Sequence, residues 1–224
     1  MATRPYQNRV TPFGDVIATP ARGLFLGNRG GRLHDNETRE LGRRRWASRQ
    51  WICCLLEFRG RRMEVFGPNH YTQLFFLDEA TALAAGHRPC FECRRADALR
   101  FRDALVAGNP GLRFERPPTA AEMDRVLNAA RLGPGGTKRM FEAPAADLPP
   151  GTMLTLDGET AWLLWNGELH RWTPAGYTER RPLPRGAVTV LTPEPTVGAL
   201  RAGYGPVVHP SANVSPADVL GKNI

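Results

Sequence analysis

Short apolar runs separated by turn residues fill the first third of the chain and predict a small β-sheet. Residues 10–18 have apolar side chains on both sides of Gly14-Asp15, which indicates a hairpin that turns at these two residues. The run at residues 51–58 is apolar over most of its length, as expected for a buried strand. Further strands are predicted at residues 23–26, at 63–66 after a turn over 59–62, and at 74–77.

Helical spacing of apolar residues follows the last of these strands. Asp78 is a suitable N-cap for a helix over residues 79–85. A second helix is predicted over residues 90–106. Thr119 and Glu122 have the spacing of a capping box, which predicts the start of a third helix.

Strand signals resume in the last third of the chain. Asp157-Gly158 and Asn166-Gly167 are typical two-residue hairpin turns between apolar runs. A short helix over residues 193–202 is expected to be capped by Thr192. The predicted strands are residues 152–156, 161–165, 168–172 and 187–191.

These elements predict an α+β protein. A small sheet with helices is expected over residues 1–132, and a smaller β-rich lobe over residues 151–224. Residues 133–150 are rich in glycine and proline and are the predicted linker.

Length and hydropathy narrow the class of protein. The chain of 224 residues is long enough to bury a hydrophobic core. No apolar run approaches the roughly 20 residues of a membrane span, and the first ten residues lack the apolar core of a signal peptide. We therefore expect a soluble cytoplasmic protein with no membrane partner.

The net charge of +8 is concentrated near the start of the chain. Residues 1–62 contain 13 arginines and 5 acidic residues, whereas the rest of the chain is balanced. Such a basic segment suggests a nucleic acid or another polyanion as partner, and an ordinary solvated face is the alternative. Arginines interleaved with tryptophan suit phosphate contacts and base stacking. The candidate nucleic-acid-binding residues are Arg29, Arg32, Arg43, Arg44, Arg45, Trp46 and Arg49.

Residues 27–35 combine glycines with arginines. Glycine lets backbone amides approach an anion, so this loop is a candidate phosphate site, and a plain flexible loop is the alternative. His34 and Asp35 at its end are candidates for a catalytic base and its carboxylate partner. The preferred interpretation is that Asp35 begins a helix over residues 36–41.

The four cysteines indicate a metal site more than a disulfide framework. Cys90-Phe91-Glu92-Cys93 has the spacing of half a zinc site, and a redox pair is the alternative. The predicted helix places this pair at a helix N-terminus, which favours thiolates. Cys53 and Cys54 are adjacent on a predicted strand, so only one of them can face a metal held on one side.

Residues 74–93 resemble the second half of the zinc-binding domain of Ada-type proteins, which repair methylphosphotriesters in DNA. In that family an aromatic strand leads into a helix ending Ala-Ala-Gly, followed by an aromatic residue, Arg-Pro-Cys and a second cysteine three positions on. The segment ending at Cys93 matches this order. The chain as a whole is similar to small bacterial proteins that carry such a segment. The resemblance implies that Cys90 and Cys93 are zinc ligands and that the module contacts DNA.

This chain departs from that family in its remaining ligands. The family takes the other two from a C-x-x-x-C segment, which includes the methyl-accepting thiolate, and no such segment occurs here. A zinc site could instead be completed by Cys53 or Cys54 together with His70 or His87. A metal-free fold with buried thiols is the alternative.

The leading functional hypothesis is a zinc-binding protein that binds nucleic acid, DNA rather than RNA, with a link to DNA repair or processing. A second hypothesis is a metal- or cysteine-dependent enzyme that acts on nucleic acid or a phosphorylated substrate near residues 27–35. A third is an interaction module whose arginine-rich face meets an acidic protein.

Overall fold

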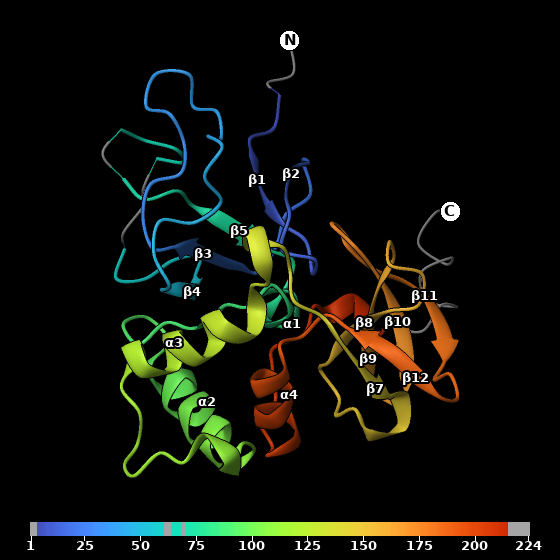
Figure 1. Cartoon of the computed structure of the whole chain (residues 1–224). Helices are drawn as coiled ribbons and strands as arrows, with labels where there is room; N and C mark the ends of the chain where they lie inside the picture. The colour runs from blue at the N-terminus through green and yellow to red at the C-terminus, as the bar shows by residue number, and fades with distance from the viewer. Residues whose placement is uncertain (1–3, 61–63, 69, 215–224) are drawn as a thin grey trace.

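The described residues of the computed structural model form two six-stranded β-sheets and four α-helices (Figure 1). The model describes residues 4–60, 64–68 and 70–214. The predicted α+β class is confirmed, with a mixed sheet in the N-terminal part and an antiparallel sheet in the C-terminal part. Within the described residues no helix has both the length and the apolar character that crossing a membrane requires.

The first sheet contains both parallel and antiparallel pairs. The predicted hairpin about Gly14 is present as β1 and β2, and β1 also pairs in parallel with β5. The last pair in this sheet, β4 with β6, is parallel as well. The order across the sheet is β2 (Val16–Ala18), β1 (Gln7–Val10), β5 (Leu74–Phe76), β3 (Phe25–Arg29), β4 (Trp51–Leu55) and β6 (Arg88–Pro89).

The second sheet is a series of antiparallel pairs. The turn between β9 and β10 has left-handed φ angles of 50° at Asn166 and 80° at Gly167, as a tight hairpin turn requires. The order across the sheet is β11 (Gly176–Pro182), β10 (Glu168–Thr173), β9 (Ala161–Trp165), β8 (Met153–Thr155), β12 (Ala187–Val190) and β7 (Phe141–Pro144).

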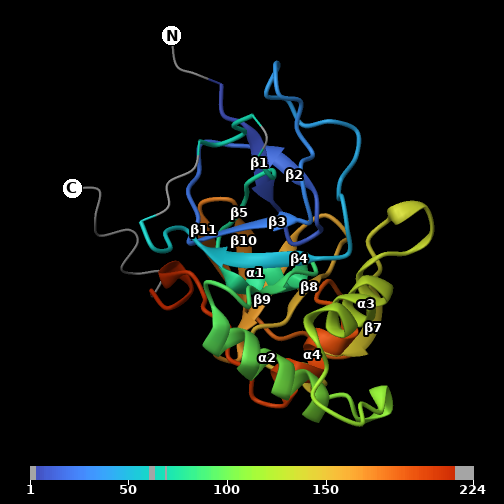
Figure 2. The same cartoon turned by 90° about the vertical axis from the view of Figure 1, so that its left-hand side faces the viewer.

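The helices lie between and below the sheets, as two perpendicular views show (Figures 1 and 2). The side chain of Asp78 accepts a hydrogen bond from the Thr81 N–H at 2.9 Å and begins α1 as predicted. The predicted capping box of Thr119 and Glu122 is also present. The helices are α1 (Glu79–Ala84), α2 (Arg95–Ala107), α3 (Ala120–Arg131) and α4 (Glu194–Arg201), with 3-10 turns at Pro110–Leu112, Pro134–Gly136, Ala145–Asp147 and Pro210–Ala212.

Helix α1 belongs to the core of both sheets. Its residues Ala80 and Ala84 are fully buried in one cluster with Met153 and Leu163 of the second sheet. Helix α4, from the C-terminal part of the chain, packs against helices of the N-terminal part: its Leu200 lies in a cluster with side chains of α2 and α3. The two halves of the chain therefore share hydrophobic cores.

Two buried carboxylates at the start of α1 reinforce this junction. Asp78 accepts hydrogen bonds from the Tyr177 hydroxyl at 2.8 Å and from the His209 N–H at 2.9 Å. Glu79 accepts one from the Tyr204 hydroxyl at 2.6 Å. All three donors come from the last quarter of the chain, so this chain segment completes the environment of α1.

Several predicted elements differ from the structure. Helix α2 begins at Arg95 instead of residue 90, because residues 91–94 form turns. The predicted strand at residues 63–66 is wrong where it can be seen: residue 63 lies outside the described residues, and 64–66 form no strand. Thr192 does not cap α4, since its hydroxyl accepts a hydrogen bond from the Met153 N–H. The predicted linker contains β7, and β11 was not predicted.

Candidate functional site

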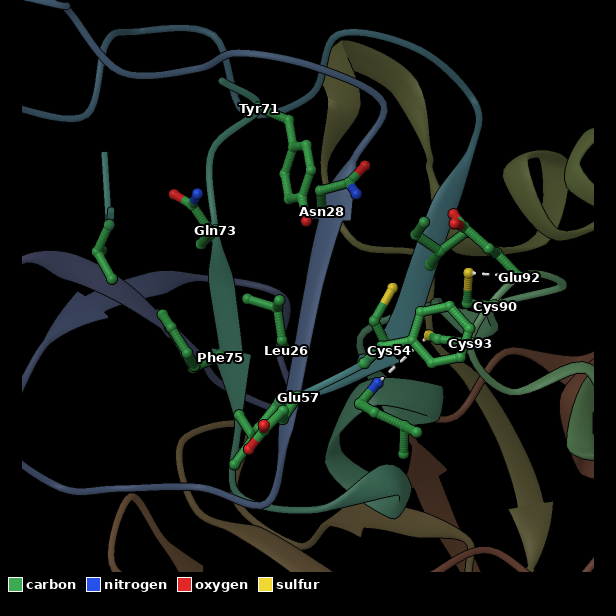
Figure 3. A pocket seen from close by; sticks show the side chains of 15 residues that line it. Leu26, Asn28, Cys54, Glu57, Tyr71, Gln73, Phe75, Cys90, Glu92 and Cys93 are labelled. Atoms are coloured by element: carbon green, nitrogen blue, oxygen red, sulfur yellow. Dashed lines mark hydrogen bonds between the residues drawn. The ribbon is translucent and has the colours of Figure 1, made fainter. Parts of the chain in front are cut away.

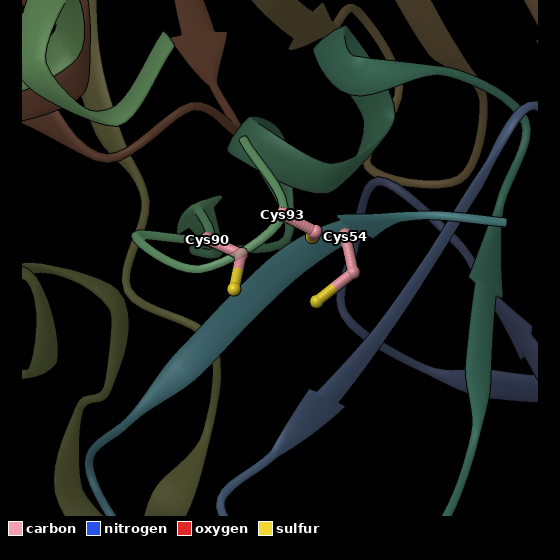
Figure 4. A group of neighbouring side chains, drawn as sticks. All are labelled: Cys54, Cys90 and Cys93. Atoms are coloured by element: carbon pink, nitrogen blue, oxygen red, sulfur yellow. The ribbon is translucent and has the colours of Figure 1, made fainter. Parts of the chain in front are cut away.

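Three cysteine sulfurs converge at one edge of the first sheet. Cys54 comes from β4, and Cys90 and Cys93 come from the turn before α2 (Figure 4). Their Sγ atoms all lie within 4.8 Å of one another. Sulfurs around a tetrahedral zinc ion, with bonds of about 2.3 Å, lie about 3.8 Å apart. The cluster therefore needs only a small closure to hold a metal ion.

The pairing of β4 with β6 brings these cysteines together. Cys53 lies beside Pro89 in the parallel register, and the Cys90 N–H donates to the Cys53 carbonyl at 3.0 Å. Alternation along β4 then points Cys53 into the core and Cys54 towards the turn. The expectation that only one of the adjacent cysteines faces the cluster is met, and that residue is Cys54.

Backbone amides support the sulfurs. The Glu92 N–H donates to Cys90 Sγ, and the Leu55 N–H donates to Cys93 Sγ, each at 3.4 Å. Such N–H donors stabilise thiolate charge and fix the orientation of metal-binding sulfurs.

The three thiols also affect one another's ionisation. Hydrogen bonds from Cys54 and Cys93 lower the pKa of Cys90, whereas hydrogen bonding to Cys90 and Cys93, together with burial, raises the pKa of Cys54. Like charges this close oppose further ionisation of the group. A bound metal ion would allow all three to ionise.

The other predicted ligands lie elsewhere. Cys53 is completely buried, and its sulfur contacts the Arg94 guanidinium at 3.5 Å. His87 is also completely buried, between the Trp51 and Phe76 rings. His70 is exposed and lines a separate hollow. In the described part of the chain no fourth Cys, His, Asp or Glu joins the cluster.

A cavity of about 530 Å³ opens beside the three sulfurs (Figure 3). Its walls combine apolar side chains with amide, phenol and carboxylate groups, and its size is typical of small-molecule sites. Burial, followed by the neighbouring cysteine sulfurs, raises the pKa of Tyr71, so its hydroxyl remains protonated. The lining residues include Leu26, Asn28, Glu57, Tyr71, Gln73, Phe75 and Glu92.

His34 and Asp35 do not form the proposed catalytic pair. The His34 ring is buried, stacks on Phe66 at 4.7 Å and lies 2.8 Å from the Thr72 hydroxyl. Burial lowers its pKa, so the ring is a neutral part of the core. The Asp35 carboxylate accepts backbone hydrogen bonds at residues 37 and 38, which closes a turn instead of the helix predicted at 36–41.

The predicted nucleic-acid-binding residues separate into two groups. Arg29 is only 2% exposed, because its guanidinium lies over the Trp51 ring, 4.1 Å from the centroid. It cannot make the surface contact expected of it. Trp46 is partly buried, with its ring centroid 6.0 Å from that of Trp51. The exposed residues, all on the loop between β3 and β4, are Arg32, Arg43, Arg44, Arg45 and Arg49.

Comparison of the chain with protein-family models, curated proteins and solved structures finds no match. The resemblance of residues 74–93 to the Ada-type domain stays a prediction. The cysteine cluster, its cavity and the basic residues are therefore the features that bear on function.

Proposed function

We propose that the protein is a zinc protein whose ion is held by Cys54, Cys90 and Cys93 and takes its fourth ligand from the adjoining cavity. The observation that carries this proposal is the convergence of three sulfurs without a fourth protein ligand among the described residues. Structural zinc sites are closed by four protein ligands, whereas catalytic sites have three and an open position. The cluster corresponds to the second arrangement.

The cavity suits a small molecule. When bound, zinc supplies a Lewis acid that polarises a carbonyl group or acidifies a water molecule. Leu26 and Phe75 exclude water from one wall, while Asn28, Tyr71 and Gln73 provide hydrogen-bonding groups that orient the molecule.

Metal-assisted hydrolysis is the reaction class that this combination favours. Proton transfer would fall to a carboxylate of the lining, and Glu57 and Glu92 are the two residues that provide one.

The metal content of two neighbouring variants tests this proposal. We expect close to one zinc ion per chain in protein purified without chelator, and none in Cys54→Ala. Cys53→Ala is the matched control, since Cys53 is adjacent on the same strand but points into the core. It should retain the full zinc content in elemental analysis. A folded wild-type protein without metal, or equal metal content in both variants, would contradict the proposal.

Nucleic-acid binding, with DNA as the favoured partner and a link to DNA repair or processing, is the second candidate. Arg43, Arg44 and Arg49 are exposed on one loop, and none of them forms an ion pair with a carboxylate in the described part of the chain. Exposed guanidiniums without carboxylate partners suit phosphate contacts.

A triple Arg→Gln variant at positions 43, 44 and 49 should weaken DNA binding and its salt dependence. Each lost phosphate contact reduces the slope of log K against log salt by about 0.9, so a decrease of about 2 to 3 is expected in a fluorescence-anisotropy titration. The control replaces Arg100, Arg116 and Arg125, which pair with Asp97 or Glu122. Equal affinities and slopes for both triple variants would exclude this loop as the binding surface.

A further inference from the structure

A second cavity, which we call the Trp51 pocket, lies on the opposite face of β4 from the cysteine cluster. It measures about 470 Å³ and is bounded by the β1–β2 turn, the loop before β4 and the segment that follows α3. Four of its lining residues are basic, namely Arg29, Arg45, Arg131 and Lys138. Asp15 is the one acidic residue in the described lining.

The innermost cations are held by an aromatic ring and by carbonyl oxygens. The guanidiniums of Arg29 and Arg131 lie 4.1 and 4.0 Å from the Trp51 ring centroid. Arg29 donates to the Gly14 carbonyl at 2.8 Å, and Arg131 to the Gly86 carbonyl at 2.9 Å.

Lys138 is held by a carbonyl oxygen alone. Its Nζ donates to the Ala84 carbonyl at 2.6 Å. The hydrogen-bond acceptors of all three cations are thus neutral groups.

No counter-ion reaches these cations within the described residues, since none of Arg29, Arg131 and Lys138 lies within 4.0 Å of a carboxylate oxygen. Arg131 is 1% exposed, and its Nε has no hydrogen-bond partner. The Nδ1 atom of His87, beside Arg29, is likewise buried without a partner.

Burial of these cations is unfavourable for the stability of the fold. Burial lowers the pKa of Arg29 and of Arg131 to about 9 and that of Lys138 to about 7. The carboxylates of Asp15 and Asp124 oppose this effect, and repulsion among the cations adds to it. Buried charges are normally paired, because desolvation of an unpaired ion is unfavourable. An anion in the pocket would offset this cost.

We propose that the Trp51 pocket binds the phosphate group of a small molecule, either inorganic phosphate or a phosphate monoester. Its cations outnumber the single carboxylate by three, which suits a doubly charged anion. Phe13, Trp46 and Met140 supply an apolar wall beside the cations, against which the organic part of a monoester would pack. This inference does not depend on the metal centre.

Fluorescence titration tests this proposal, because Trp46 and Trp51 report directly from the pocket. The probes are inorganic phosphate, adenosine 5′-monophosphate and adenosine, at constant ionic strength in chloride. Both phosphates should alter the tryptophan emission and raise the melting temperature, whereas adenosine should not. Tighter binding of the nucleotide would assign a monoester, and equal binding would assign free phosphate.

Two variants locate the site. Arg45→Gln, on the exposed rim, should weaken binding about tenfold, the effect of losing one charged hydrogen bond. Lys138→Met should weaken it similarly and also raise the melting temperature of the free protein, because it removes an unpaired buried cation. Arg100→Gln is the control, since Arg100 is exposed but does not line the pocket. No response to either phosphate, an equal response to adenosine, or equal effects of Arg45→Gln and Arg100→Gln would overturn the proposal.

Discussion

Removal of zinc by a chelator is expected to lower the free energy of unfolding by about 4 kcal/mol at a free zinc concentration a thousandfold above the dissociation constant. In the proposed zinc site the ion would join strand β4 to the turn before α2, and the unfolded chain offers no preformed group of three thiolates. For a chain of this length, that change corresponds to a decrease of about 10 °C in the melting temperature. Differential scanning calorimetry with and without chelator measures it.

The cysteine variants separate metal loss from a general effect of the chelator. Cys54→Ala should melt near the temperature of the chelated wild type and should not respond to chelator. Cys53→Ala should respond as the wild type does, since its sulfur lies outside the cluster. An unchanged melting temperature after proven zinc removal would show that the ion does not stabilise the fold.

Glu79→Ala is expected to destabilise the zinc-loaded protein by about 3–5 kcal/mol, the usual cost of breaking a buried ion pair. Glu79 is 1% exposed and lies 2.9 Å from the Arg94 guanidinium. Its carboxylate also accepts hydrogen bonds from the Tyr204 hydroxyl and the Val207 N–H. The substitution leaves all three donors without this acceptor, and urea denaturation at constant free zinc measures the loss.

Asp97→Asn provides the matched control for this prediction. Asp97 is the second carboxylate partner of Arg94, at 2.7 Å, but its side chain is 28% exposed. Water can replace it, so we expect a loss of about 1 kcal/mol or less. Equal losses for the two variants would indicate that the buried location of Glu79 has no special importance.

Elements whose signals are local could be predicted from the sequence. The cap at Asp78, the capping box at Thr119 and the two Gly-containing hairpin turns each need only a few neighbouring residues. These features fixed the order of helices and strands in most of the fold.

The two edge strands of the second sheet were not predicted, and the reason differs between them. Strand β7 contains a proline and pairs with β12, more than 40 residues away. Strand β11 is rich in charged residues and lies at the other edge of the second sheet, so it lacks the alternation of a half-buried strand.

The candidate site, like the fold, could be predicted from the sequence only in part. Strand alternation shows that only one of Cys53 and Cys54 faces a metal, but the choice depends on which face β6 and the turn after it occupy. Arg29 was expected on the surface because arginine usually lies there. Its burial over Trp51 depends on tertiary packing that its sequence neighbours do not reveal.

The carboxylates at the start of α1 have a consequence for the newly made chain. Asp78 and Glu79 leave the ribosome long before the residues that satisfy them, and Tyr204 follows Glu79 by 125 positions. Translation at 5–20 residues per second separates these events by on the order of 10 s. During that interval burial of α1 would leave both carboxylates without the donors that the last quarter of the chain supplies. The first sheet is thus expected to reach its final packing only after residues 204–209 have emerged, so the two halves of the chain complete their folding together.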